Sequence, residues 1–373
     1  MMILLLALAG IAGDRTPIRT LRGLSRPNET ETVLPLGYYE ALINTSSHGA
    51  AAPTSGPPAG WLPFGGEETG IVQELPTYLR WNMKPNLDIR WNGALFRTNR
   101  LGFRTPEVST EKPARTFRIL VFGSSNSMGY GVSNHEIYTS LLEGWLRSWV
   151  GPSYRVEVVN LSVAGDSPSR RLCRLQQEAQ RFHPDWLICD ASSFDSWLED
   201  SHIQGVVDRR LPIPFPFVEK AIRRTGVTPG ETLESFRAKF QGESERMFDA
   251  VYAGWSAESN RLGVPMTVVI LPRADSKGKS PRVLQLIRSL AERHGLDCLD
   301  IANAFDALDV DEFRISAWDK HPNARGHRVI FEAIRGALLS RGQLPGFPPR
   351  PTGPNEPALS SNFDRPAHAA RSK

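Results

Sequence analysis

The chain has 373 residues, enough for one large domain or two modest ones with a proper hydrophobic core. Its 44 basic and 40 acidic residues nearly balance, and no basic run with interleaved aromatic residues occurs, which argues against a nucleic-acid partner. The pairs Arg170-Arg171 and Arg223-Arg224 are interpreted as solvated helix faces. Three cysteines, odd in number and without metal-ligand spacing, indicate neither a zinc site nor a disulfide framework.

The chain begins with a run of 13 residues that carries no charge and is mostly apolar. A bilayer span needs about 20 apolar residues, so this run is too short to cross a membrane. It matches the apolar part of a secretory signal, although a basic leader is missing. We expect residues 1–13 to be a signal segment or truncated anchor. The protein would then be exported to the periplasm, cell envelope or medium. Association with the envelope or a membrane is one of the expected outcomes of such export. A buried element in a cytoplasmic protein is the alternative.

Three further regions flank the expected compact part. Residues 14–60 are rich in Pro, Ser, Thr and Gly and are predicted to be a flexible linker. Residues 61–112 alternate apolar with polar side chains, and the pair Asn92-Gly93 lies where a hairpin turn would, so we expect a small β-rich appendage. Residues 343–373 are predicted to be a disordered tail.

Between residues 113 and 342, strand-like and helix-like patterns alternate. This order predicts a three-layer α/β/α, flavodoxin-like domain with a five-stranded, mostly parallel sheet in the order 2-1-3-4-5. Sites in such sheets lie at the carboxyl ends of the strands. The expected strands are 118–123, 154–161, 186–191, 265–271 and 296–301, and the expected helices 136–149, 170–182, 232–262, 282–294 and 323–339.

The first expected strand ends in a serine-rich turn that begins with Gly123-Ser124-Ser125 and continues to Gly131. Glycines around small polar residues permit a tight turn that exposes a hydroxyl and directs backbone N–H groups at one spot. The alternative is an ordinary turn that caps the following helix. A phosphate-binding loop is excluded because the Gly-Lys-Ser/Thr ending is missing.

A second candidate lies before the last expected helix, where Asp319 precedes His321 by two residues and Pro322 stiffens the turn. A carboxylate in this position can orient an imidazole and stabilise its protonated form. Histidine can take a proton from a serine near neutral pH and return it. The alternative is a plain helix start capped by Asn323.

These segments resemble the conserved blocks of the SGNH (GDSL-type) hydrolases. Residues 118–132 resemble the first block, usually Gly-Asp-Ser followed by Gly-Tyr-Gly, and residues 160–165 resemble the second. Residues 319–327 match the last block in its Asp-x-His form. Residues 84–86 and 99–104 also resemble the leader segment of exported members, so the resemblance covers roughly residues 85–340.

The resemblance assigns roles to individual residues. It implies Ser125 as the nucleophile, His321 as general base and acid, and Asp319 as the residue that orients His321. The backbone N–H groups of Ser125 and Gly165 would be oxyanion donors. Ser127 is the fallback nucleophile. The resemblance implies no metal and no organic cofactor.

The sequence also departs from the family pattern. The usual aspartate before the nucleophile is Ser124, and the oxyanion asparagine of the third block is Phe194, whose ring cannot donate a hydrogen bond. The hydroxyl of Ser192 or Ser193 is a candidate substitute donor, and in that case Phe194 would line the acyl pocket. His327 is expected to brace the last turn.

The expected function is therefore hydrolysis of a small, acetyl-type acyl ester through an acyl-serine intermediate. With export expected, an acetylated sugar or cell-envelope glycan is the expected substrate. An O-acyltransferase of the same fold is one alternative, since it differs only in the acceptor. A catalytically degenerate binding protein is the other, and Phe194 is the feature that favours it. The sequence gives no oligomeric state.

Overall fold

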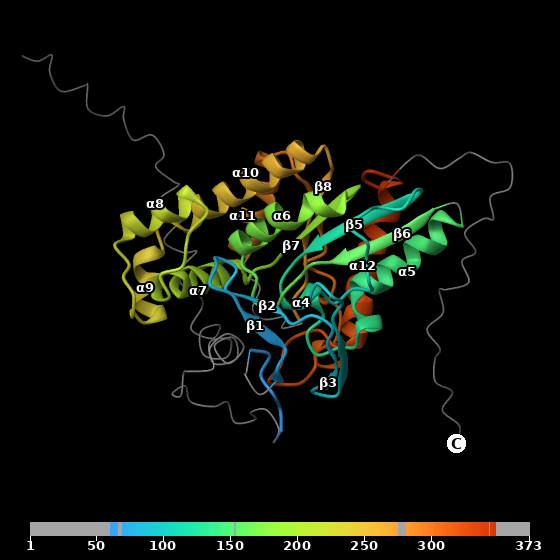
Figure 1. Cartoon of the computed structure of the whole chain (residues 1–373), viewed down its shortest axis with the longest axis horizontal. Helices are drawn as coiled ribbons and strands as arrows, with labels where there is room; N and C mark the ends of the chain where they lie inside the picture. Colours follow the sequence, from blue (N-terminus) through green and yellow to red (C-terminus); the bar gives the residue numbers. More distant parts are fainter. Residues whose placement is uncertain (1–59, 66–68, 153, 275–280, 343, 348–373) are drawn as a thin grey trace, which may run out of the picture.

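The computed structural model describes residues 60–65, 69–152, 154–274, 281–342 and 344–347 (Figure 1). The expected signal segment, nearly all of the expected linker and most of the expected tail lie outside these residues. Within the described ranges, no helix has both the length and the apolar character needed to cross a membrane.

Among the described residues, four short strands come first, and strands then alternate with helices. The strands are β1 (Val72–Glu74), β2 (Trp81–Met83), β3 (Asp88–Trp91), β4 (Ala94–Arg97), β5 (Thr116–Phe122), β6 (Arg155–Asn160), β7 (Trp186–Ala191), β8 (Met266–Ile270) and β9 (Asp297–Asp300). The α-helices are α4 (Ser125–Met128), α5 (Tyr138–Val150), α6 (Pro168–Phe182), α7 (Asp195–Asp208), α8 (Pro216–Thr225), α9 (Leu233–Phe240), α10 (Ser244–Leu262), α11 (Pro281–Arg293) and α12 (Ala324–Arg341). Short 3-10 turns span η2 (Asn134–Glu136) and η3 (Val310–Glu312).

The central sheet has five parallel strands in the order β6-β5-β7-β8-β9. This is the predicted order 2-1-3-4-5, and the predicted fold class is confirmed. The middle strands β5, β7 and β8 are buried along their whole length because helices cover both faces of a parallel sheet. All seven residues of β5 are buried.

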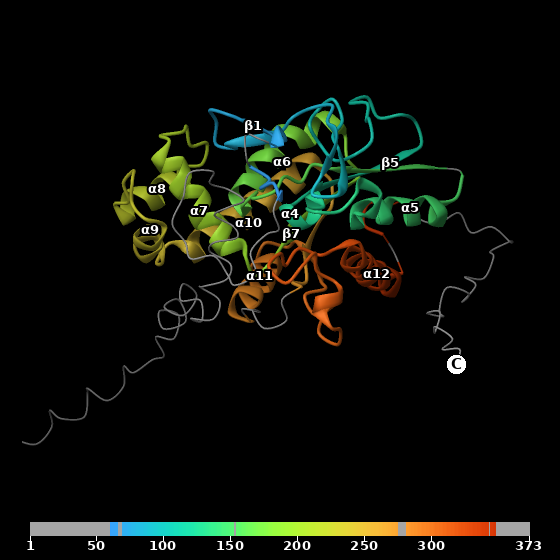
Figure 2. The ribbon, with the colours of Figure 1, turned by 90° about the horizontal axis from the view of Figure 1, so that it is seen from below.

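Alternate side chains of β5 enter two separate cores. Ile119 and Val121 pack with α5 and α12 on one face, while Leu120 and Phe122 pack with α6 and α10 on the other. In Figure 2, α5 and α12 lie side by side on the far side of β5 from β1. The three layers therefore follow from the two-residue period of the strands.

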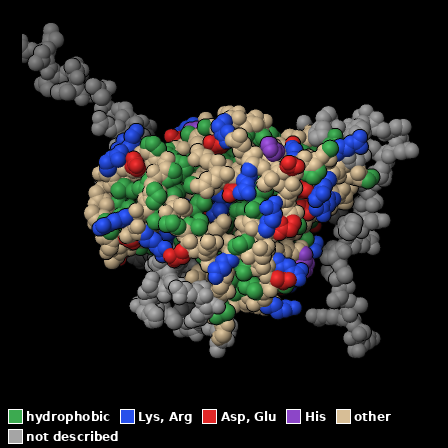
Figure 3. All heavy atoms as spheres, in the orientation of Figure 1, with side chains coloured by type: hydrophobic (Ala, Val, Ile, Leu, Met, Phe, Trp, Pro, Cys, Tyr) green, Lys and Arg blue, Asp and Glu red, His purple; other side chains and the backbone are tan. Residues whose placement is uncertain are grey.

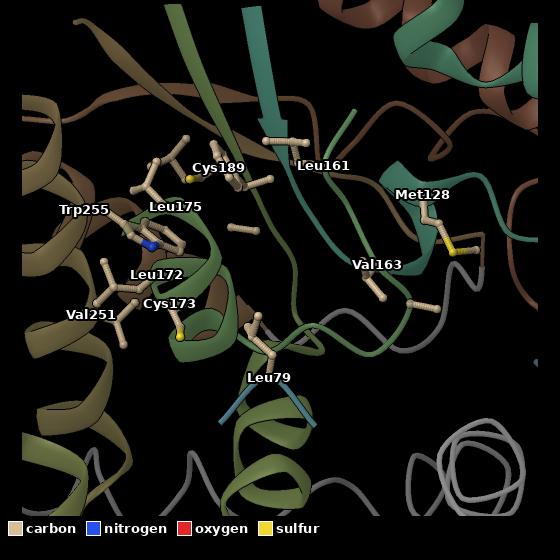
Figure 4. Packing of buried hydrophobic residues seen from close by; sticks show 14 of the residues in the cluster. Leu79, Met128, Leu161, Val163, Leu172, Cys173, Leu175, Cys189, Val251 and Trp255 are labelled. Carbon is tan, nitrogen blue, oxygen red and sulfur yellow. The ribbon is translucent and has the colours of Figure 1, made fainter. Parts of the chain in front are cut away.

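The core on the α6 face extends beyond the central sheet. Figure 4 shows Trp255 of α10 beside Leu172 and Leu175 of α6, close to Cys189 of β7. The same cluster includes Leu79, which lies between β1 and β2. Residues 61–112 thus share one hydrophobic core with the α/β domain.

The β-rich character predicted for residues 61–112 is present as two small antiparallel sheets, β1-β2 and β3-β4. The predicted turn at Asn92 and Gly93 joins β3 to β4, with φ of 47° and 86°. Both residues are left-handed, as a two-residue type I′ hairpin requires.

The helical region after β7 differs from the prediction. The single helix expected at 232–262 is two helices, α9 and α10, interrupted around Gly242, a residue that disfavours helix interiors. Helices α7 and α8 were not predicted. In α7, residues 197–200 are buried without interruption, so the helix lacks the amphipathic period by which helices are recognised.

The interpretation of Arg170 and Arg171 as a solvated helix face is wrong, because both side chains are fully buried in α6. They pair with buried carboxylates, Arg170 with Asp166 and Arg171 with Asp195. The exposed face in Figure 3 instead shows basic and acidic side chains interspersed.

Candidate active site

Four loops at the carboxyl ends of the strands carry the residues of interest. Ser125 follows β5, Gly165 follows β6 and Phe194 follows β7. Asp319 and His321 lie between β9 and α12. This is the edge of the sheet where open α/β folds place their sites.

The structure brings three of the predicted residues into one hydrogen-bonded chain. His321 Nε2 lies 2.8 Å from Ser125 Oγ, and His321 Nδ1 lies 2.9 Å from Asp319 Oδ1. All three residues are buried, and Ser125 is the most exposed at 7%. Hydrogen bonds at these distances let a serine hydroxyl pass its proton to an imidazole that a carboxylate orients.

The loop before α12 fixes the orientation of Asp319 and His321. The His321 backbone N–H donates to Asp319 Oδ1 at 3.0 Å. One carboxylate oxygen therefore contacts both the backbone N–H and the ring Nδ1 of the histidine. Ile315 N–H donates to the His321 carbonyl at 2.9 Å, and Ser316 N–H donates to the Asp319 carbonyl at 3.1 Å. The loop is therefore closed on itself before α12 begins.

Ser125 is the first residue of the short helix α4, and this position determines where its backbone N–H points. The N–H groups in the first turn of a helix have no intrahelical acceptor, so the Ser125 N–H is available to an external oxygen. Gly123, just before this turn, has no room for a side chain, since a Cβ there would lie 2.3 Å from Asp190 Oδ2. The turn therefore requires glycine at position 123.

Asp190, near the end of β7, is a site residue that the sequence analysis missed. Its Oδ2 accepts from Ser124 N–H at 3.0 Å and from Ser127 Oγ at 2.6 Å. Burial raises the pKa of Asp190, and the nearby Arg171 partly offsets this rise. A buried carboxylate thus supports the nucleophile turn although Ser124 replaces the usual aspartate. The signal was a charged residue within an otherwise apolar strand.

The hydroxyl of Ser127, the fallback nucleophile, forms hydrogen bonds with groups other than His321. The Ser127 side chain is fully buried, and its Oγ also lies 2.7 Å from the Tyr138 hydroxyl. The structure leaves Ser125 as the serine whose Oγ lies against His321.

The expected oxyanion region combines three strand ends. Gly165 has a φ of 78°, a left-handed conformation that glycine adopts readily. Ser192 Oγ donates to Asp195 Oδ1 at 3.3 Å and accepts from Phe194 N–H at 3.2 Å, so this hydroxyl is used within its own turn. Ser193 Oγ accepts from the Arg273 guanidinium at 3.4 Å and so retains its own hydrogen for donation. Of the two serines, Ser193 is therefore the candidate donor, because the Ser192 hydroxyl already donates to Asp195.

Phe194 lies half-buried at the start of α7, and its ring is covered by an arginine that the sequence analysis also missed. The Arg273 Cζ lies 3.7 Å from the ring centroid, a cation–π contact. Arg273 follows β8, so it reaches the site from the neighbouring strand end. It had no sequence signal, since nothing near it in the chain resembles a family block.

His327 is fully buried behind the site. Its Nδ1 accepts from Tyr138 N–H at 3.3 Å, and the two rings lie nearly parallel at 6.2 Å. Burial, with smaller contributions from Arg104 and His321, lowers the pKa of His327 to about 3. The residue therefore stays neutral and links α12 to α5, in agreement with the bracing role expected for it.

The family comparison agrees with this geometry. The model of the GDSL-like lipase/acylhydrolase family matches residues 121–329, more than half of the chain. The chain belongs to this family. It is accordingly an ester-cleaving enzyme. The matched span includes Ser125, Gly165, Asp319 and His321.

Solved structures give more distant similarities. TesA is 14% identical with a TM-score of 0.39, covering 60% of this chain and 98% of that one. A two-domain esterase (CEX) active on acetylated mannans is 14% identical with a TM-score of 0.42, covering 68% of this chain and 54% of that one. The acetyl xylan esterase AlAXEase is 14% identical with a TM-score of 0.40, covering 60% and 100%. No curated protein sequence matches the chain.

In the part of the chain that the structure describes, His, Cys, Asp and Glu side chains form no group of three that could hold a metal ion.

Proposed function

We propose that this GDSL-family enzyme is a serine hydrolase that cleaves a small, acetyl-type acyl ester through an acyl-Ser125 intermediate. The observation that carries the proposal is the chain of two hydrogen bonds, 2.8 Å from Ser125 Oγ to His321 Nε2 and 2.9 Å from His321 Nδ1 to Asp319 Oδ1.

The first half of the reaction forms the acyl-enzyme. Ser125 Oγ attacks the ester carbonyl carbon while its proton moves to His321 Nε2, and Asp319 stabilises the imidazolium that results. The negative carbonyl oxygen of the tetrahedral intermediate accepts from Ser125 N–H and Gly165 N–H. The carbon–oxygen bond to the alcohol then breaks, and the alcohol leaves with the proton from His321.

The second half regenerates the enzyme. A water molecule gives a proton to His321 Nε2 and attacks the acyl carbonyl carbon. The intermediate collapses, Ser125 Oγ takes the proton back from His321, and the carboxylic acid leaves. No redox step or external group is involved.

We propose a carbohydrate as the alcohol part of the ester. Two half-buried indoles, Trp61 and Trp318, meet edge to face with ring centroids 5.2 Å apart. Trp318 immediately precedes Asp319 in the chain. Indoles with partly accessible rings offer apolar surface next to a polar N–H, a combination that suits the mixed surface of a sugar ring. Export of the protein, predicted from residues 1–13, is part of the same proposal.

The proposal is tested by steady-state kinetics on an aryl acetate and on an acetylated oligosaccharide. Ser125→Ala and His321→Ala should each lower kcat by several orders of magnitude, and the double variant should be no slower than the single ones because the residues act as one unit. Ser148→Ala is the matched control, since this exposed serine lies in α5 away from the site. Thermal unfolding should show that all variants remain folded.

Substantial activity in Ser125→Ala would contradict the proposed nucleophile. A double variant much slower than either single one would contradict the shared mechanism. Activity on the aryl ester without activity on any acetylated glycan would contradict the substrate while leaving the mechanism intact.

A further inference from the structure

One face of the His321 ring is covered by Tyr130. The two ring centroids are 4.1 Å apart and the planes differ by 18°, which is a stacked arrangement. Tyr130 is 1% exposed and His321 2% exposed, so water has little access to this contact. The Tyr130 backbone N–H donates to the Ser125 carbonyl at 3.0 Å, so the same residue is tied to the nucleophile turn.

Behind Tyr130 lies an aromatic cluster that comes from residues 61–112. The ring of Trp91, the last residue of β3, meets Tyr130 edge to face with centroids 4.6 Å apart. Phe64 and Phe96 pack against Trp91 at 5.7 Å and 5.8 Å. Trp91 Nε1 donates to the Leu62 carbonyl at 2.9 Å, which fixes the indole in its plane. Edge-to-face pairs of this kind resist rotation of either ring.

Arg104 fastens the turn that carries Tyr130 to the same segment. Its guanidinium donates to the carbonyl of Gly129 and, at 2.7 Å, to that of Val132, the residues on either side of the tyrosine turn. It also donates to the Leu95 carbonyl of β4 at 3.2 Å. The turn contains Gly129 and Gly131, both left-handed, so it has little stiffness of its own and depends on such contacts.

From these contacts we infer that the β3–β4 hairpin is a working part of the active site: through Trp91 and Tyr130 it holds the His321 ring in the plane that faces Ser125. Trp91 lies before residue 121, where the family match begins, so this brace is an addition to the matched domain. Tyr130 and Trp91 are positioning residues, since they act through His321. The inference rests on the proposed role of His321 as general base.

The consequence is kinetic. An imidazole that is free to tilt spends less time within proton-transfer distance of Ser125 Oγ, and a displacement of about 1 Å can cost roughly a hundredfold in rate. We expect substrate binding to change little with the ring plane, because the proposed role of the ring is proton transfer. Loss of the brace should therefore lower kcat and leave KM nearly unchanged.

The test compares Trp91→Leu and Tyr130→Leu with Trp91→Phe and Tyr130→Phe in the full chain. The leucine variants should lose about tenfold to a hundredfold in kcat, with KM within about twofold. The phenylalanine variants keep an aromatic ring in place and should recover most of the turnover. Phe240→Leu is the matched control: it removes one ring of a buried pair with Phe236, stacked at 4.9 Å in α9, away from the site.

The control should lose stability in thermal unfolding but keep its kcat. Leucine variants with wild-type kcat, or phenylalanine variants as slow as the leucine ones, would overturn the brace. So would a fall in kcat of Phe240→Leu that matches its loss of stability, because the effect would then be general. Inactive Ser125→Ala together with fully active Trp91→Leu would reject the brace alone, whereas active Ser125→Ala would reject the proposed function itself. If Tyr130→Leu does not fold, the Trp91 pair decides the question.

Discussion

At the scale of single residues, the oxyanion region departs most from the family pattern. The Phe194 ring cannot donate a hydrogen bond, and the Ser192 hydroxyl is engaged within its own turn. In the proposed mechanism two backbone donors remain, from Ser125 and Gly165, with Ser193 as the candidate third. Removing one preorganised donor costs on the order of 3 kcal/mol of transition-state stabilisation, about a hundredfold in rate.

We therefore expect Phe194→Asn to raise kcat, because the asparagine amide restores a donor at the start of α7. The gain should stay below the hundredfold limit, because the substitution also removes the ring that Arg273 covers at 3.7 Å. Steady-state kinetics of Phe194→Asn and Ser193→Ala measure the contributions of a donor at position 194 and of the Ser193 hydroxyl. Unchanged or lower kcat in the first variant, with a large loss in the second, would show that Ser193 already supplies the third donor.

The sequence predicted those site residues that lie within short motifs. Ser125 is bracketed by glycines after an apolar strand, and Asp319 and His321 are two positions apart, so local spacing made them candidates and the family resemblance assigned their roles. Asp190 and Arg273 act through contacts with residues far away in the chain, Asp190 with Ser124 and Arg273 with Phe194. Such partners are fixed by the strand order. The charge of Asp190 within an apolar strand was a signal but did not indicate its partner, and Arg273 left no local pattern.

At the level of secondary-structure elements, helix α6 carries buried arginines whose burial its sequence alone does not indicate. Arg171 forms ion pairs with both Asp190 and Asp195, at 3.0 Å and 2.6 Å, and all three side chains are nearly inaccessible. Because Asp190 also holds the nucleophile turn, this helix links the core to the site. A pair of arginines on a helix predicted solvent exposure, but buried carboxylates make burial possible. Asp166 pairs with Arg170, and Asp190 of β7 and Asp195 of α7 pair with Arg171.

Arg171→Met should therefore be strongly destabilising, by about 3–5 kcal/mol, because it leaves two buried carboxylates without their cation. Arg223→Met is the matched control in α8, where the arginine is exposed and its distance to Glu219 is 3.6 Å. Its effect should be within about 0.5 kcal/mol. Urea unfolding of both variants measures the difference. Equal stabilities would contradict the view that the buried cluster supports the fold.

The strand order was predictable because β5, β7 and β8 are apolar runs and the family of doubly wound sheets leaves few alternatives. The interruption of the helix at Gly242 was visible in the sequence but was outweighed by the apolar pattern on either side of it. Helix α7 was missed because burial on all sides removes the periodic signal.

At the scale of the whole molecule, stability should depend on pH through His327. Burial lowers the pKa of His327 to about 3, below the value of about 6.5 for an exposed histidine. The folded state therefore binds fewer protons than the unfolded state between these values. The stability that depends on neutral His327 is present above pH 6.5 and is lost as the pH falls toward 3, by at most about 1.4 kcal/mol per pH unit.

His327→Asn tests this dependence, since the side-chain oxygen can still accept from Tyr138 N–H while the amide does not titrate in this range. The variant should have a lower Tm than the wild type at pH 7.5, because the smaller side chain leaves a cavity. The difference in Tm should shrink as the pH falls from 6.5 to 4. A difference that stays constant over this range would contradict a neutral, buried His327.

The central claim for the molecule is that Ser125 carries the acyl group during turnover. The most direct measurement is mass spectrometry of the protein quenched in acid during reaction with an aryl acetate, followed by peptide mapping. The account predicts one acetyl group on the peptide that contains Ser125, located on Ser125 by fragmentation and missing from Ser125→Ala. An acetyl group on Ser127, or on another residue that turns over at the rate of the reaction, would contradict it.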